Sequence, residues 1–218
     1  MSAGNESSRQ EALTWLCDRY WYPIYAFLRR HGHAPAAAQD FTQGFLMRFL
    51  ERRSMEGADP ERGRFRSYLL GALKHYLADC QDHANARMRG GGFHFQPLSF
   101  ATGEERYLQC PENLSPEALY ERQWALSLLS RVLDLMRAEQ EAAGKAALFD
   151  RLKSFLTADA DYRQAAAGLG MQEGALRVTV HRLRRRYKDL LTAEIAETVA
   201  EPGEVQREIR YLIGVLSA

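Results

Sequence analysis

One segment near the C-terminal end, Tyr162–Lys188, constrains the fold more than any other part of this 218-residue chain. Its first part carries Ala165 and Ala166, whose small side chains permit two helices to approach closely. Gly170 then supplies the backbone freedom of a tight turn. Beyond the turn, apolar side chains recur on one helical face: Leu176, Val180, Leu183 and Tyr187. The pattern predicts a helix–turn–helix whose second helix is buried along one side.

The opposite face of this second helix is basic. Between Gly174 and Lys188 there are six Arg or Lys residues and no acidic residue, although the net charge of the whole chain is only +1. Because a phosphate backbone responds to local charge, the near-neutral average does not exclude a nucleic-acid partner. Such a helix is suited to the major groove, with base edges at its N-terminal residues and phosphates at its later arginines. The alternative is a solvated basic helix of an ordinary bundle.

The rest of the chain also predicts helices. From about Arg9 to Arg89, apolar residues recur at helical spacing. Three glycines at 90–92 end this half, and the chain up to Pro116 is rich in proline and weakly periodic, which indicates an extended linker. We therefore predict an all-α fold of two small helical domains joined by a linker, followed by a C-terminal helix. The predicted ranges are 9–89 for the first domain, 90–115 for the linker, 116–194 for the second domain and 195–218 for the C-terminal extension.

Composition and missing motifs restrict the function classes. The three cysteines, at wide and unpatterned spacing, do not suggest a disulfide framework, and no signal-peptide core or run of 18 apolar residues occurs. We expect a cytoplasmic protein without membrane insertion. Neither Cys80-x-x-His83 nor His31-x-His33 has a matching second half of a metal site, and no nucleophile or P-loop motif occurs. The sequence therefore predicts no catalytic residues, no metal and no cofactor.

Three motifs together resemble extracytoplasmic-function sigma factors, a group of the sigma-70 family of bacteria. The segment Gly174–Leu191 is similar to the recognition helix of their domain 4. The segment Gln39–Leu50, which contains Asp-Phe-Thr-Gln, is similar to the helix that docks domain 2 on core RNA polymerase. The segment Phe65–Asp79, which opens with Phe-Arg-Ser-Tyr-Leu, resembles the helix that recognises the −10 element. The chain departs from the family pattern at Gly44, where Glu is usual, and at His75, where Asn is common.

The resemblance implies a transcription initiation factor and not an enzyme. Its partners would be core RNA polymerase, promoter DNA and, as a further class, an anti-sigma factor or other regulator. Three sets of residues carry the implied contacts. Polymerase would be bound by Asp40, Gln43 and Arg48. The melted −10 element would be bound by Arg62, Arg64, Arg66, Lys74 and His75, with Tyr68 or Tyr76 available for stacking. The −35 element would be contacted by Arg177, Val178, His181, Arg182 and Arg185.

Two questions stay open from the sequence. A helix-turn-helix regulator that acts without core polymerase would explain the second half of the chain but not the motifs of the first half. The amphipathic stretch Glu204–Leu216 has an apolar face wide enough to bind another element. It either packs on the second domain or the linker, or masks a DNA-binding surface until a signal displaces it.

Overall fold

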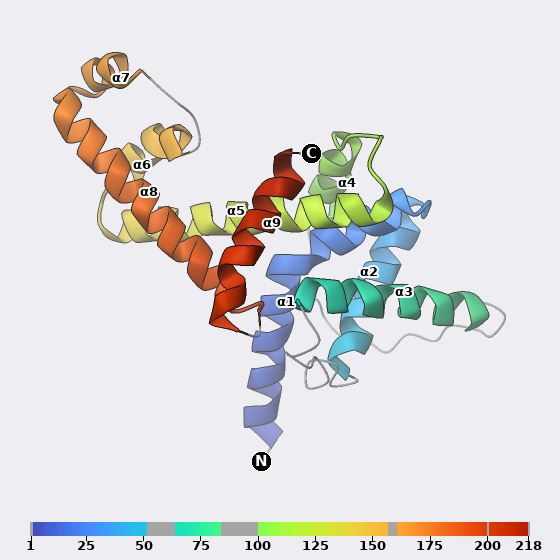
Figure 1. Cartoon of the computed structure of the whole chain (residues 1–218). Helices are drawn as coiled ribbons and strands as arrows, with labels where there is room; N and C mark the ends of the chain where they lie inside the picture. The colour runs from blue at the N-terminus through green and yellow to red at the C-terminus, as the bar shows by residue number, and fades with distance from the viewer. Residues whose placement is uncertain (1, 52–63, 84–99, 157–160, 200, 218) are drawn as a thin grey trace. The chain divides into compact units, whose positions relative to one another are not determined.

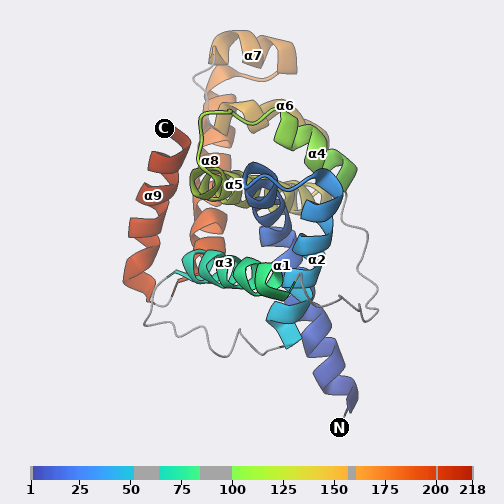
Figure 2. The same cartoon turned by 90° about the vertical axis from the view of Figure 1, so that its right-hand side faces the viewer.

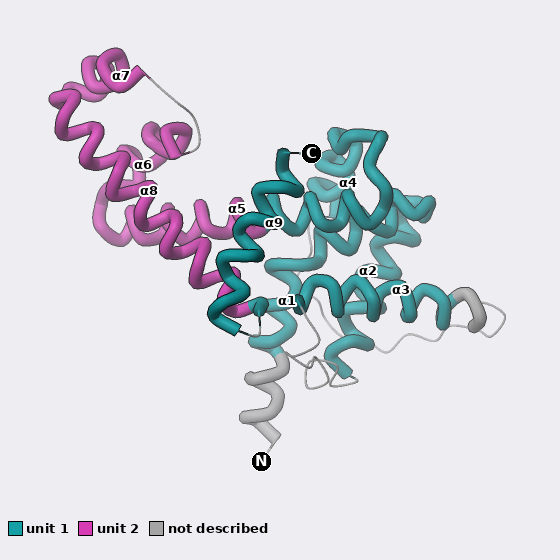
Figure 3. The backbone as a smooth tube through the Cα atoms, in the orientation of Figure 1, with its two compact units in different colours: residues 1–127, 198–218 teal, residues 128–197 magenta. Residues whose placement is uncertain are grey.

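The computed structural model describes residues 2–51, 64–83, 100–156, 161–199 and 201–217. This part of the chain is helical, without any strand, which confirms the predicted all-α class. It divides into two compact units (Figure 3). Unit 1 comprises residues 1–127 and 198–218, and unit 2 comprises residues 128–197. None of the described helices is both long enough and apolar enough to cross a membrane.

Three helices form the base of unit 1. Helices α1 (Ser2–Arg30) and α2 (Pro35–Glu51) run side by side in opposite directions, and α3 (Phe65–His83) passes across them (Figures 1 and 2). The turn between α1 and α2 is possible because Gly32 adopts φ +99°, which side chains rarely tolerate. Pro35 then opens α2, where its missing N–H costs nothing. The buried apolar core of this part contains Leu16, Tyr20, Ile24, Phe27, Phe45, Leu46, Phe49, Leu69 and Leu73.

A fourth helix corrects the prediction of an extended linker over 90–115 in the part that the structure describes, which begins at residue 100. Residues 100–108 form α4 (Phe100–Leu108), which packs against α1. Gly103 permits this contact, because a Cβ atom there would lie 2.9 Å from the indole of Trp21. Glu104 fixes α4 by accepting hydrogen bonds from Arg29 (2.7 and 2.8 Å) and from the hydroxyl of Tyr25 (2.6 Å). The helix is short and held by partners about 80 residues away, so local periodicity is a poor guide to it.

Loss of this carboxylate is expected to destabilise unit 1. The hydrogen bonds from Arg29 lower the pKa of Glu104, so its stabilising charge is present above the unfolded-state pKa of about 4.3 and is lost as the pH falls through the lower folded-state pKa. We expect Glu104→Gln to reduce the free energy of unfolding by about 1–2 kcal/mol at pH 7, since bonds to a charged group are partly screened by solvent here. Urea unfolding should show this difference shrinking below about pH 4. A difference that is constant from pH 7 to pH 3 would contradict this assignment.

The C-terminal extension belongs to unit 1. Helix α5 (Pro116–Ala142) begins in this unit, and the hydroxyl of Ser115 caps it by accepting a hydrogen bond from the N–H of Ala118 at 3.1 Å. A short 3-10 turn, η3 (Pro202–Glu204), leads into α9 (Val205–Ser217). Ion pairs join α9 to the start of α3, and Arg122 of α5 donates to the last carbonyls of α9. Helix α9 therefore packs against the start of α5, which opens the predicted second domain, and against α3 of the predicted first domain.

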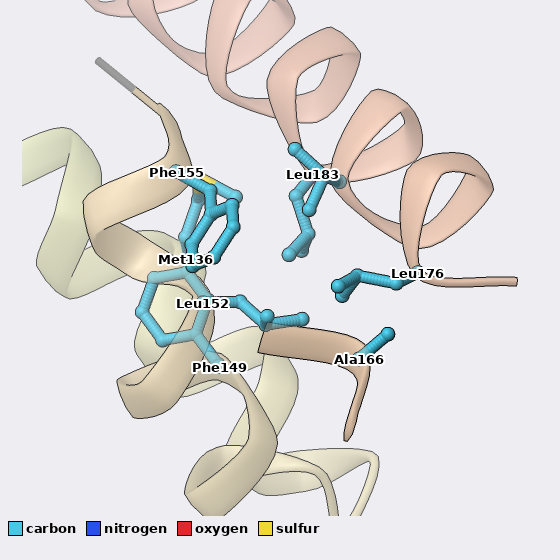
Figure 4. Close-up of a cluster of buried hydrophobic side chains, with 8 residues drawn as sticks. Met136, Phe149, Leu152, Phe155, Ala166, Leu176 and Leu183 are labelled. Atoms are coloured by element: carbon cyan, nitrogen blue, oxygen red, sulfur yellow. The ribbon is translucent and has the colours of Figure 1, made fainter. Parts of the chain in front are cut away.

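Unit 2 contains the predicted helix–turn–helix. After the C-terminal part of α5 come α6 (Ala146–Leu152), η2 (Lys153–Leu156), α7 (Tyr162–Leu169) and α8 (Glu173–Ala196). Figure 4 shows the core in which side chains of these elements meet. Its fully buried members are Met136, Phe149, Leu152, Phe155, Ala166, Leu176, Val180 and Leu183. Helix α7 begins at the first residue of the predicted segment Tyr162–Lys188, whereas α8 extends eight residues past its last residue.

Candidate nucleic-acid interface

The turn between α7 and α8 is built from local signals. Asp161 caps α7, because its carboxylate accepts the backbone N–H groups of Arg163 (2.9 Å) and Gln164 (3.1 Å). Gly170 ends the helix in the left-handed conformation, with φ +64°. The backbone N–H of Met171 then bonds to the carbonyl of Ala166 at 3.0 Å. These contacts fix the direction in which α8 leaves the turn.

Burial of one side of α8 determines which side chains face outward. Leu176, Val180 and Leu183 are buried in the core of unit 2. Val178, with 51% of its surface exposed, lies on the opposite face, which is unusual for a valine and leaves its methyl groups open to a ligand. The other four residues expected to contact the −35 element are exposed as well: Arg177, His181, Arg182 and Arg185. The structure thus places all five on the outer side of one helix.

The arginines of α8 divide into two groups. Arg184 donates to the backbone carbonyl of Phe155 (2.8 and 3.0 Å), and Arg186 forms an ion pair with Glu139 of α5, which lowers the pKa of that carboxyl. Both side chains therefore serve the fold of unit 2. Arg182 and Arg185 have no hydrogen-bond or ion-pair partner within the described ranges. The basic surface available to a ligand is smaller than the six cations of the sequence suggest.

Arg177 is held in place before any ligand arrives. Its guanidinium bonds to the carboxylate of Glu173, one turn earlier, at 2.7 Å. It also lies over the ring of Tyr162, 4.6 Å from the ring centroid. Tyr162 was not a predicted site residue, and no local pattern links it to an arginine 15 positions later. A hollow of about 450 Å³ lies here, lined by Tyr162, Arg177, Val178, His181, Arg182 and Arg184.

The residues expected to bind polymerase do not form one cluster. Asp40 is exposed and Gln43 is half-buried on α2. Arg48 forms an ion pair with Asp79 of α3 at 2.5 Å, and its guanidinium lies 5.6 Å from the ring centroid of Tyr76. Arg48 therefore joins α2 to α3 in addition to any contact with a partner.

The residues expected to bind the −10 element are dispersed. Arg62 lies outside the described residues. Lys74 is exposed and forms an ion pair with Glu117 at 2.7 Å. His75 is exposed and borders a hollow of about 420 Å³ between α2 and α3. Aromatic side chains supply much of the lining of this hollow, together with one ion pair: Phe45, Phe49, Tyr68, Tyr76, Arg48 and Asp79.

Arg66 occupies a place that the sequence did not indicate. Only 2% of its side chain is exposed, and it bonds to the carboxylates of Glu121, at 2.5 Å, and Glu208. The ring of Trp124 lies beneath the guanidinium, 4.6 Å away. The prediction that Arg66 contacts DNA is therefore corrected for this conformation, because the guanidinium is buried and its Nε and Nη1 are occupied by carboxylates. Arg64, beside it, is one-third exposed and pairs with Glu208 at 2.6 Å.

Tyr76 is half-buried and packs against two aromatic rings of α2. Its ring contacts those of Phe41 and Phe45, with centroid distances of 6.5 and 5.7 Å. Burial, together with a hydrogen bond to Cys80, raises the pKa of its hydroxyl. Gly44 makes this placement possible, since a Cβ atom at that position would lie 2.5 Å from the Tyr76 hydroxyl oxygen. The departure from the family pattern at Gly44 thus has a steric cause.

This contact predicts an unusual response to a helix-favouring substitution. Replacing glycine by alanine inside a helix ordinarily stabilises a protein by about 1 kcal/mol. We expect Gly44→Ala to bring no such gain, because the new methyl group must displace the Tyr76 ring. In a Tyr76→Phe background the nearest ring atom lies 3.6 Å away, so the same substitution should stabilise by about 1 kcal/mol. Thermal unfolding of the four proteins gives the coupling energy, and equal effects in both backgrounds would refute the steric account.

Comparison with known proteins identifies no relative of this chain. No protein-family model matches the chain, and no curated protein or solved structure matches it either. Within the ranges that the structure describes, no three His, Cys, Asp or Glu side chains are grouped so as to hold a metal ion.

Proposed function

We propose that this chain is a transcription initiation factor of the sigma type, which binds core RNA polymerase and directs it to promoter DNA. The observation that carries the proposal is the outer face of α8. There Val178, Arg182 and Arg185 project from a helix that is locked by its buried side and by the capped turn before it. This is the arrangement in which a helix enters the major groove and places side chains on base edges and phosphates.

Specificity for the −35 element would come from the hollow beside Arg177. A guanidinium held by Glu173 and Tyr162 keeps its planar fork oriented, which favours bidentate bonds to a guanine. The exposed methyl groups of Val178 suit the methyl group of a thymine. Arg182 and Arg185, unpaired within the described residues, would then neutralise phosphates on either side of the groove.

Unit 1 would contact the polymerase and the melted strand. The exposed carboxylate of Asp40 and the half-buried amide of Gln43 are available to the polymerase on the surface of α2. The hollow between α2 and α3 combines Tyr68, which is 37% exposed, with His75 at its border. A tyrosine ring and an imidazole are suited to stack with an unpaired base. The similarity of the motifs in this unit to sigma domain 2 favours this function over a regulator that acts alone.

Run-off transcription tests the proposal directly. Duplexes that bind the chain in the presence of purified core polymerase are selected from a random library, and the selected sites serve as templates. We expect specific transcripts from intact duplexes with the chain present, and none with core polymerase alone. A template melted beforehand over the −10 region should reduce the need for unit 1. Specific duplex binding without any transcript, and without co-purification with core polymerase, would favour the regulator and overturn the proposal.

A further inference from the structure

Helix α9 places a buried carboxylate between two arginines. Only 1% of Glu208 is exposed, and each of its oxygens faces a different guanidinium. Oε2 lies 2.6 Å from Nε of Arg64, and Oε1 bonds to Nη1 of Arg66. One carboxylate that bridges two guanidiniums in this way has the charge and the separated acceptor oxygens with which a phosphate group binds to arginines.

A second residue of α9 completes the contact. The ring of Tyr211, one turn after Glu208, lies 4.3 Å from the guanidinium of Arg66 and 5.1 Å from that of Arg64. Aromatic faces and carboxylate together form the kind of surroundings in which arginines bind nucleotides: stacking from one side and oxygen acceptors from another. Helix α9 thus offers the two arginines an aromatic ring and an anionic oxygen acceptor, which correspond to the base and the phosphate of a nucleotide.

The charges of the cluster around Arg64 and Arg66 would be unbalanced without α9. With α9 in place, the guanidiniums of Arg64 and Arg66 are balanced by the carboxylates of Glu121 and Glu208. Without Glu208, the same cluster carries one excess positive charge at the start of α3. The first turn of α3 contains no acidic residue, so the negative charge that a helix N-terminus favours comes here from α9.

The remaining attachment of α9 is modest. Val205 and Leu212 are its buried apolar residues, and Arg122 donates to its final carbonyls at distances of 3.4 and 3.5 Å, which are long for hydrogen bonds. On the outer side, 57% of Ile213 is exposed. A helix of 13 residues with two buried and four half-buried apolar side chains is short enough to leave its site when a competitor for the arginines is present.

We propose that Arg64 and Arg66 form a binding site for a backbone phosphate of single-stranded nucleic acid, and that Glu208 occupies this site in the free chain. Helix α9 is then an internal competitor, and nucleic acid displaces it. The inference rests on the proposed function only in naming the strand that is bound during initiation. It also returns Arg64 to the role that the sequence indicated, with a condition: α9 must move first.

Binding of a labelled single-stranded oligodeoxynucleotide, measured by fluorescence anisotropy without polymerase, tests this site. Glu208→Gln keeps the shape of the side chain and removes its charge. We expect it to raise the affinity for the oligonucleotide by about tenfold. The slope of log affinity against log salt should also become steeper, by the amount that about one additional phosphate contact contributes. The matched control is Glu204→Gln, which should leave the affinity unchanged because Glu204 pairs with the exposed Arg207, at 3.2 Å. In the double variant Arg64→Gln/Glu208→Gln the gain should disappear.

A gain that persists in the double variant would overturn the proposal, as would an affinity of Glu208→Gln equal to that of the wild type. Inorganic phosphate provides the second arm. If it raises the melting temperature of Glu208→Gln while the oligonucleotide binds no better, the site accepts free anions and the nucleic-acid assignment fails.

Hydrogen exchange of the wild-type chain keeps the proposal testable should Glu208→Gln fold poorly. Amides of α9 are expected to exchange at least several-fold faster when the oligonucleotide is saturating, and unchanged protection would sink the competitor mechanism. Neither measurement contains polymerase. Their failure alongside successful run-off transcription would remove this inference alone, whereas absent transcription with a positive anisotropy result would remove the proposed function alone.

Discussion

Replacing Arg66 with methionine is expected to lower the free energy of unfolding of unit 1 by about 3–5 kcal/mol. The substitution leaves the buried carboxylate of Glu208 with only the partly exposed Arg64 to balance it, and it removes the guanidinium that pairs with the half-buried Glu121. It also removes the cation that lies over the rings of Trp124 and Tyr211. An isolated buried charge is among the most destabilising changes that a single substitution can make.

Tryptophan fluorescence during urea unfolding measures this effect in unit 1 specifically. All three tryptophans of the chain, Trp15, Trp21 and Trp124, lie in that unit. Arg64→Met is the matched control, and we expect a loss of only about 1 kcal/mol because its side chain is one-third exposed. The pair Arg66→Met/Glu208→Met should recover part of the stability, since it removes one of the unbalanced carboxylates. A loss below about 1 kcal/mol for Arg66→Met would show that the cluster is not a structural centre of the unit.

The burial of Arg66 could not be predicted from the sequence. Its position within a motif similar to a −10 recognition helix suggested contact with DNA. Its actual partner, Glu208, lies 142 residues further along the chain. No periodicity or motif connects two such positions, because the pairing is created by the packing of α9 on α3. The same holds for α4, which is held by Arg29 and Tyr25 and which the sequence assigned to a linker.

Features with local causes were predictable. The helix Tyr162–Leu169 starts after the cap Asp161 and ends at Gly170, as these local signals dictate. The buried stripe of α8 was predicted in the same way, because a helical wheel requires only the spacing of Leu176, Val180 and Leu183. The helical wheel could not predict which arginines have partners within the chain, because Arg184 and Arg186 bind groups on other elements, η2 and α5.

That division of the arginines leads to the expected behaviour of α8 variants on duplex DNA. The double substitution Arg182→Ala/Arg185→Ala removes the two cations that have no partner in the described part of the chain. If each neutralises one phosphate, the slope of log affinity against log salt should fall by about 1.8, which corresponds to a loss on the order of 50-fold at 0.1 M salt. The loss should be nearly uniform across DNA sequences, because phosphates carry no base identity. Arg186→Ala, the matched control, removes an arginine engaged by Glu139 and should change the slope by much less.

Arg177→Ala is expected to behave differently from these phosphate variants. A bidentate bond to a base edge contributes about 1–3 kcal/mol of discrimination, so about five- to a hundredfold of preference should be lost at a single base-pair position while the salt slope changes by about one unit or less. Tyr162→Leu should weaken the same preference partially, because the guanidinium then keeps only Glu173 as its support. Selection of bound duplexes from a random library, repeated with each variant, measures these preferences position by position. If Arg177→Ala lowers affinity for every duplex equally, Arg177 binds phosphate, and the hollow beside Tyr162 does not select a base.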